Sequence, residues 1–233
     1  MERQELDGDR IFTLGGFLSP KEGIMIQTRL RIGLAHVGQA LRDPEEFALR
    51  WHREGTPYAW GVFAVLSLTA IAGTLSYGLT LGILGGPARM LTTALACTAA
   101  AGIGWGLPLP ALYVLNSLSG SRLRASTTFL AALVTTSWGG LALMASIPIN
   151  WFFTVAVPVG WFVLLVNLVV FAGVGAAMVD VFCRVMERLE PTRGRAPGWW
   201  LLLVGAIGGE LFYAFELFDF SSIQPIVGRL LGQ

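Results

Sequence analysis

The sequence predicts an all-α polytopic membrane protein with five transmembrane helices and an N-terminal cytoplasmic amphipathic helical segment. The 233 residues are 54% hydrophobic and 13% charged, about half the charged share of a typical soluble domain. The apolar residues gather in five long stretches, and the 29 glycines suit helices that approach one another closely in a bilayer. The net charge of +1 provides no basic field, so we expect no nucleic-acid partner.

Residues 1–57 form the only sizeable polar region, and we expect them to lie at the cytoplasmic membrane surface. Their apolar residues fall at helical spacing on one stripe, namely Ile26, Leu30, Leu34, Val37 and Leu41. Asp43 followed by Pro44 predicts the start of a second short helix, with Asp43 as N-cap and an end near Arg53. We interpret the pair as a lead-in that rests on the membrane; packing on a partner is the alternative.

The predicted transmembrane domain covers residues 58–220. Its five spans are residues 59–84, 90–118, 123–147, 157–181 and 198–220. Two prolines, Pro108 and Pro110, predict a kink in the second span because a proline removes a backbone donor; a re-entrant break is the alternative. The run from Pro148 to Asn150 is interpreted as a short connection between the third and fourth spans, and residues 221–233 as a short extracytoplasmic tail.

The cations predict how the protein sits in the membrane. With these five spans, fourteen of the sixteen Lys and Arg residues lie on one side, and Arg89 and Arg229 lie on the other. The positive-inside rule then places the N-terminus in the cytoplasm and the C-terminus outside. In a bacterium this would be the inner membrane.

A polar layer is predicted near the middle of the spans. Glu210 lies about 18 Å into the fifth span, where an ionisable group is costly and therefore needs a reason. Asn167 lies near the middle of the fourth span, and three hydroxyl residues lie near the middle of the third, namely Thr135, Thr136 and Ser137. Such a layer would suit an ion or proton site, but it would serve equally as interhelical hydrogen bonding.

Gly205 and Gly209 precede Glu210 with the small-xxx-small spacing. This spacing predicts close packing against another helix, either within the chain or in an oligomer. At the inner end of the fourth span, Asp180 and Arg184 are four residues apart and predict a local ion pair.

No catalytic residues, metal ligands or cofactors are predicted. His36 and His52 belong to no ligand motif, and the sequence contains no phosphate loop, nucleophile elbow, CxxC or haem-attachment signature. Cys97 and Cys183 fall in or beside apolar segments and are expected to be buried thiols. We therefore expect a protein that is not an enzyme.

Residues 109–148 read LPALYVLNSLSGSRLRASTTFLAALVTTSWGGLALMASIP: an apolar span, a polar turn containing glycine, and a span rich in small residues. This segment resembles the middle of Yip1-domain membrane proteins, including bacterial members of unknown function. The family is also similar in having five spans with the termini on opposite sides. The chain lacks the DPPLY-like motif of eukaryotic members, so the resemblance does not extend to vesicle trafficking. It implies a small membrane protein that works by assembling with partners.

These observations predict a non-enzymatic membrane scaffold or subunit of a larger complex. Its expected partners are the lipid bilayer and either other membrane-protein subunits or further copies of the same chain. The alternative is an ion or proton channel or transporter subunit that uses Glu210 together with Asn167 and the hydroxyl layer.

Overall fold

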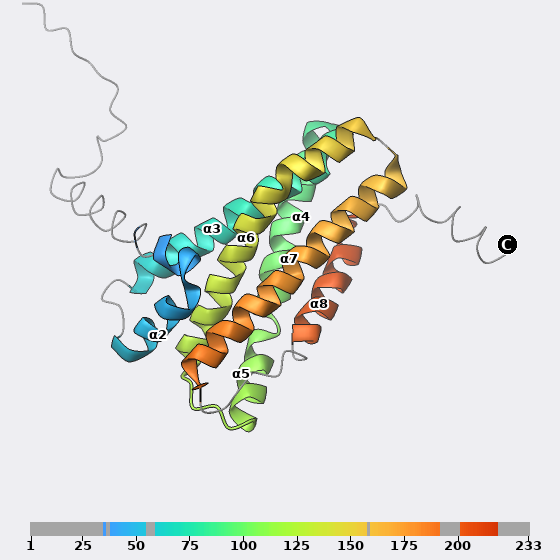
Figure 1. The fold of residues 1–233 in the computed structure, drawn as a ribbon. Coiled ribbons are helices and arrows are strands. Elements are labelled where there is room, and N and C mark those ends of the chain that lie inside the picture. The colour runs from blue at the N-terminus through green and yellow to red at the C-terminus, as the bar shows by residue number, and fades with distance from the viewer. Residues whose placement is uncertain (1–34, 36–37, 55–58, 158, 192–200, 219–233) are drawn as a thin grey trace, which may run out of the picture.

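The computed structural model describes residues 35, 38–54, 59–157, 159–191 and 201–218, and the elements formed by these residues are helices (Figure 1). Four helical segments are long and apolar enough to cross a membrane, namely Trp60–Leu81, Ile83–Leu118, Ala125–Ala156 and Gly160–Leu189. The all-helical class is thus confirmed, and the four segments are consistent with an integral membrane protein. The remaining apolar helix, α8 (Leu201–Ala214), is about 21 Å long, shorter than the roughly 30 Å hydrocarbon core.

The first two long helices form a tight hairpin. α3 (Ala59–Leu81) and α4 (Gly86–Gly106) are joined by a 3-10 turn, η1 (Ile83–Gly85). A Cβ added to Gly78 would lie 2.6 Å from Ala94 Cα, so the two backbones are in direct contact. The Thr93 hydroxyl donates to the Gly78 carbonyl at 2.8 Å and stabilises this crossing.

The helix is interrupted at the place where a kink was predicted in the second span. Leu107 and Pro108 separate α4 from α5 (Leu109–Leu118), and the Leu107 N–H makes the last bond of α4, to the Ile103 carbonyl. The helical ladder cannot continue through Pro108 because its nitrogen has no hydrogen. α5 continues in the direction of α4, toward the end of the bundle that carries α2 (Figure 1).

The predicted connection at residues 148–150 is wrong, because α6 runs without a break from Ala125 to Ala156 and contains Pro148. The side chain of Asn150 is 1% exposed and donates to the Thr80 hydroxyl of α3 at 2.9 Å. α6 therefore stays helical past Pro148 and packs on α3 there. α7 (Gly160–Leu189) begins four residues after the last residue of α6.

α6 also crosses α3 at very short range. A Cβ added to Gly73 would overlap the Gly140 carbonyl, so only glycine fits at this crossing. The Ser137 hydroxyl donates to the Leu66 carbonyl at 2.7 Å close to the same crossing. α3 and α6 therefore form the centre of the bundle (Figure 1).

α7 extends eight residues past the predicted inner end of the fourth span at residue 181. The last turns of the helix are buried because they carry apolar residues at helical spacing, namely Val181, Phe182, Val185, Met186 and Leu189. Together with Ala48 and Ala131 they form a core at the polar end of the bundle. Residues 182–189, which lie between the predicted fourth and fifth spans, are therefore helix.

The start of α2 (Pro44–Glu54) is as predicted: the Asp43 carboxylate accepts the Glu46 N–H at 3.1 Å. Phe47 and Ala48 are buried, and the helix packs against α6 and α7. α2 is thus held by the bundle itself. The interpretation of this helix as a lead-in that rests on the membrane did not predict this packing. Most of the apolar stripe between residues 26 and 41 lies outside the described residues.

Candidate functional site

The outward face of α8 carries the acid that the sequence singled out. Gly208 faces α4, where a Cβ added to Gly104 would lie 3.6 Å from Gly208 Cα. Glu210 comes two residues later, about 200° further around the helix, and its side chain is exposed. Its carboxylate has no hydrogen bond or ion pair with any other residue that the structure describes. The acid therefore points away from the bundle.

Asn167 lies elsewhere, between α3 and α7. It is 3% exposed and accepts a hydrogen bond from the hydroxyl of the fully buried Tyr77 at 2.8 Å. Its amide nitrogen donates to the Val163 carbonyl one turn earlier, also at 2.8 Å. Both ends of the amide are therefore satisfied within the bundle.

The three hydroxyls of α6 are used inside the bundle as well. Thr135 and Thr136 donate to carbonyls four residues earlier in their own helix, whereas Ser137 also reaches α3. None of the three bonds to Glu210 or Asn167, so the predicted polar layer does not form one site within the described chain. Asn167 and Ser137 instead make hydrogen bonds between helices, as expected if the polar residues serve in helix packing.

Gly205 and Gly209 are exposed, and a Cβ added to either would meet no atom within 4 Å. The predicted close packing is thus not made within the described chain, and packing in an oligomer stays a prediction. Both glycines line a cavity of about 420 Å³ between α4, α6, α7 and α8. Gly139 and Gly140 of α6 also line it, together with larger apolar side chains such as Trp105, Phe171 and Phe212, so its walls are largely apolar.

A cap explains why α8 ends at Ala214, before the boundary predicted at residue 220. Glu216 adopts a left-handed conformation with φ of 49°, and the Leu217 N–H donates to the Phe212 carbonyl at 3.0 Å. This hydrogen-bonding pattern is a Schellman cap, which ends a helix. Arg89 of α4 donates to the Glu216 carbonyl at 3.0 Å, a favourable position for a cation at a helix C-terminus.

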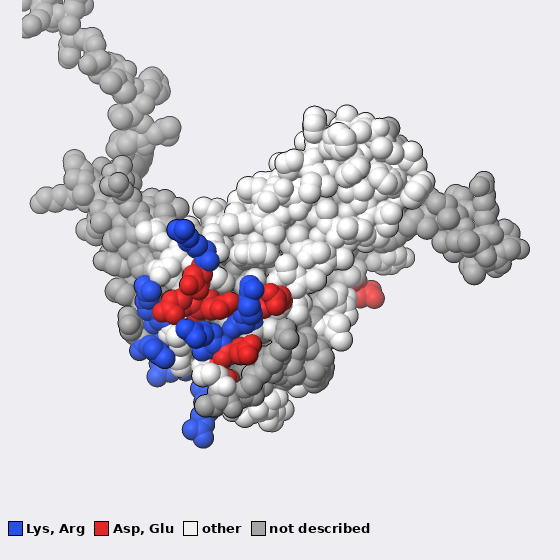
Figure 2. All heavy atoms as spheres, in the orientation of Figure 1, with Lys and Arg blue, Asp and Glu red and all other residues white. Residues whose placement is uncertain are grey.

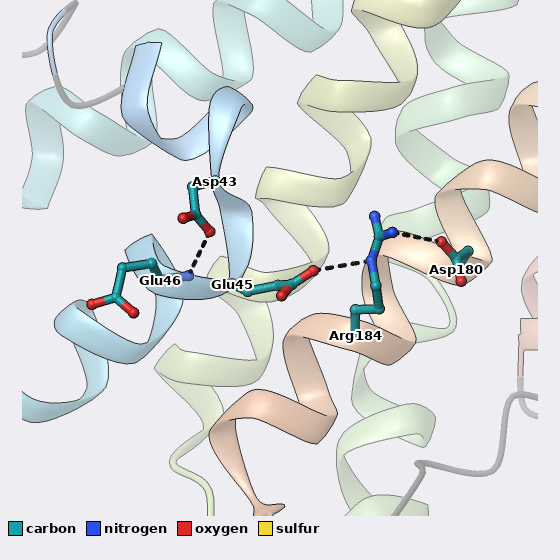
Figure 3. Close-up of polar contacts among 5 residues, drawn as sticks. All are labelled: Asp43, Glu45, Glu46, Asp180 and Arg184. Carbon is teal, nitrogen blue, oxygen red and sulfur yellow. Dashed lines mark hydrogen bonds and ion pairs between the residues drawn. The ribbon is translucent and has the colours of Figure 1, made fainter.

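A second cluster joins α2 to α7 at the polar end. The predicted pair is confirmed, with Arg184 and Asp180 3.1 Å apart, and the same guanidinium lies 3.0 Å from Glu45 (Figure 3). Arg188 lies 3.9 Å from Glu46. Figure 2 shows charged side chains gathered over this end, while most of the bundle beyond it is uncharged on this face. The contacts between the two helices were not predicted from the sequence. Arg184 and Arg188 are one turn apart on α7, and Glu45 and Glu46 are adjacent on α2.

The two cysteines and His52 form no candidate metal site with the other residues that the structure describes. Cys97 and Cys183 are both buried thiols, as predicted. The His52 ring lies 3.4 Å from the Thr127 hydroxyl. In the ranges that the structure describes, no three His, Cys, Asp or Glu side chains come together in a way that could hold a metal ion.

Comparisons with protein-family models, curated proteins and solved structures found no match for this chain. The resemblance to Yip1-domain proteins therefore stays a prediction.

Proposed function

We propose that the protein is a non-enzymatic subunit or scaffold of a larger membrane complex, and that the outward face of α8 contacts the partner. The observation that carries this proposal is the carboxyl of Glu210, which is exposed on an apolar helix and bonds to none of the residues that the structure describes. Placing a charged side chain at the centre of a membrane helix costs about 2.5–3.5 kcal/mol even on the most lenient scale. A neighbouring subunit that hydrogen-bonds the carboxyl would remove most of this cost.

The residues around Glu210 support a helix as the neighbour. Leu202 and Tyr213 are 73% and 70% exposed, and between them lie Ala206 and Gly209 on the same side of α8. Successive residues of this set are four, three and four positions apart, so they form one stripe along α8 with the small residues at its centre. Small residues let a second helix approach closely enough to reach an adjacent polar side chain.

We propose the five-span topology as well, with α8 as part of the fifth crossing. Seven of the eight arginines in the described residues belong to the end that carries α2, and Arg89 belongs to the other. This asymmetry supports a cytoplasmic location for the α2 end under the positive-inside rule. The N-terminus would then be cytoplasmic and the C-terminal tail extracytoplasmic. The proposed assembly with partners also agrees with the resemblance to Yip1-domain proteins.

Site-specific photocrosslinking in native membranes tests the proposal. A photoreactive residue at Tyr213 is expected to give one dominant protein adduct, whereas the same residue at Val169, a 63% exposed position on α7, gives mainly lipid adducts. In the Tyr213 derivative, adding Glu210→Leu should reduce the protein adduct severalfold. Equal adducts at the two positions, or a monomeric particle by native mass spectrometry, would overturn the proposal.

The channel or transporter alternative requires more from the partner. Within the described chain, Glu210 makes no bond to Asn167 or to the hydroxyls, so another subunit would have to supply the rest of the path. Proton and cation flux into liposomes, measured for wild type and Glu210→Gln, tests this alternative. Flux that depends on Glu210 would replace the scaffold by a transport subunit.

A further inference from the structure

A cavity of about 650 Å³ lies between α2 and the last two turns of α7. Its walls carry three basic and three acidic side chains: Arg53, Arg184, Arg188, Glu45, Glu46 and Glu187. The apolar residues Leu49 and Pro191 complete the lining. A cavity of balanced charge fits a ligand that itself carries both signs.

The charges in this cavity are not equally engaged. Arg184 is occupied by Glu45 at 3.0 Å and by Asp180 at 3.1 Å. Arg188 lies 3.9 Å from Glu46, beyond the roughly 2.7–2.9 Å of a charge-assisted hydrogen bond. Arg53 and Glu187 form no ion pair with another described residue. Two guanidinium groups and one carboxylate are therefore available to a ligand.

The position of the cavity along α7 indicates where such a ligand comes from. From Gly160, the start of α7, Arg184 and Arg188 are 24 and 28 residues along the helix. At 1.5 Å per residue these positions are about 36 and 42 Å from the other end of α7. The hydrocarbon core is about 30 Å thick, and the headgroup layers extend the bilayer to about 40–45 Å. With the start of α7, next to Trp161, placed at the opposite edge of the hydrocarbon core, the cavity is at the depth of the phospholipid headgroups.

We propose that this cavity binds a phospholipid headgroup that joins a phosphodiester to a primary ammonium, as in phosphatidylethanolamine. The phosphodiester lies between Arg53 and Arg188, because guanidinium groups bind phosphate oxygens in a bidentate manner. The ammonium donates to Glu187. An anionic headgroup without an amine would leave that carboxylate unpaired beside the phosphate, and a quaternary amine has no N–H to donate. The bound lipid bridges α2 and α7. This inference is independent of the proposed partner on α8.

Native mass spectrometry of the full chain in mild detergent tests the site. The protein is titrated with phosphatidylethanolamine, phosphatidylglycerol and phosphatidylcholine of identical acyl chains. Wild type is expected to bind phosphatidylethanolamine about tenfold more tightly than the other two lipids, since each of them loses a charge-assisted hydrogen bond. Equal affinity for all three lipids would overturn the assignment.

Three variants locate the binding. The double variant Arg53→Gln with Arg188→Gln should weaken phosphatidylethanolamine binding about tenfold or more, while Glu187→Gln should remove the preference over phosphatidylglycerol. Arg124→Gln is the matched control, because Arg124 is an exposed cation at the same end of the bundle that does not line the cavity. Circular dichroism and gel filtration confirm that the variants fold. If the folded double variant bound phosphatidylethanolamine as tightly as the wild type, the site would be refuted.

A competition experiment distinguishes the lipid from a soluble ligand of the same chemistry. Free phosphoethanolamine at the lipid's concentration is expected to leave the lipid bound, because it lacks the apolar tail that holds the headgroup at this depth. Displacement at equal concentration would overturn the lipid as the source of the headgroup.

Discussion

Replacement of Gly73 by alanine is expected to destabilise the bundle, because the α3–α6 crossing leaves no space for a Cβ. The added methyl group would overlap the carbonyl of Gly140, which is backbone and cannot rotate away. Gly140 is itself confined, since a Cβ there would lie 3.0 Å from Ala70 Cα. The two helices must therefore separate, and overpacking of this kind costs about 1–3 kcal/mol. The Ser137 bond to the Leu66 carbonyl would lengthen with the same movement.

Gly61→Ala in the same helix is the matched control, because a Cβ at Gly61 meets no atom within 4 Å. Alanine is a better helix former than glycine by about 0.5–1 kcal/mol, so this variant should be neutral or more stable. Because both variants gain the same helix propensity, their unfolding free energies are expected to differ by the overpacking cost alone, about 1–3 kcal/mol. Reversible unfolding in mixed micelles, followed by tryptophan fluorescence, measures this difference. Equal stability of Gly73→Ala and Gly61→Ala would refute the reasoning.

Three further predictions concern other contacts. Tyr77→Phe should cost about 1–2 kcal/mol because it leaves the buried amide oxygen of Asn167 without its donor; an unfolding free energy equal to wild type would contradict this. Phe47→Ala should free α2 from the bundle, at a cost of about 3 kcal/mol, because its side chain is buried. Arg184→Gln should cost under about 1 kcal/mol, because the ion pairs of Arg184 are half-exposed. Hydrogen exchange of the α2 amides should therefore be faster in Phe47→Ala than in Arg184→Gln, and the opposite order would contradict this. Glu216→Gly should stabilise the end of α8 by about 1 kcal/mol, since glycine adopts the left-handed conformation without strain; faster exchange there would argue against it.

The sequence correctly predicted those features of the fold that depend on interactions between residues close together in the chain. Asp43 begins α2 as expected, because an N-cap needs only a short side chain and the backbone three residues later. Pro108 interrupts the second apolar segment for the same local reason. The prediction at Pro148 was wrong because a proline inside a packed membrane helix need not end it: α6 continues to Ala156, and the buried Asn150 binds Thr80 of α3. A single sequence does not reveal that contact.

The candidate site was harder to predict, because span position alone does not tell which way a side chain faces. Asn167 and Glu210 were assigned to similar depths, yet one lies inside the bundle and the other on its outer surface. The early end of α8 had no recognisable signal either, since Glu216 occupies a position where glycine usually marks a cap. The charged cluster was predicted only in its local part, the pair of Asp180 and Arg184, because Glu45 is remote in sequence.

The uneven distribution of charge has a consequence for how the protein adapts to membrane thickness. α6 and α7 are about 48 and 45 Å long, and the link between them is flanked by Trp151 and Trp161, both about half-exposed. The opposite end carries most of the described arginines and acids, so it is fixed at its aqueous boundary, whereas the aromatic end can slide by a few ångströms. Hydrophobic mismatch costs only fractions of a kcal/mol per Å. In thicker or thinner bilayers the protein would therefore adjust at the aromatic end, while the charged end keeps its depth.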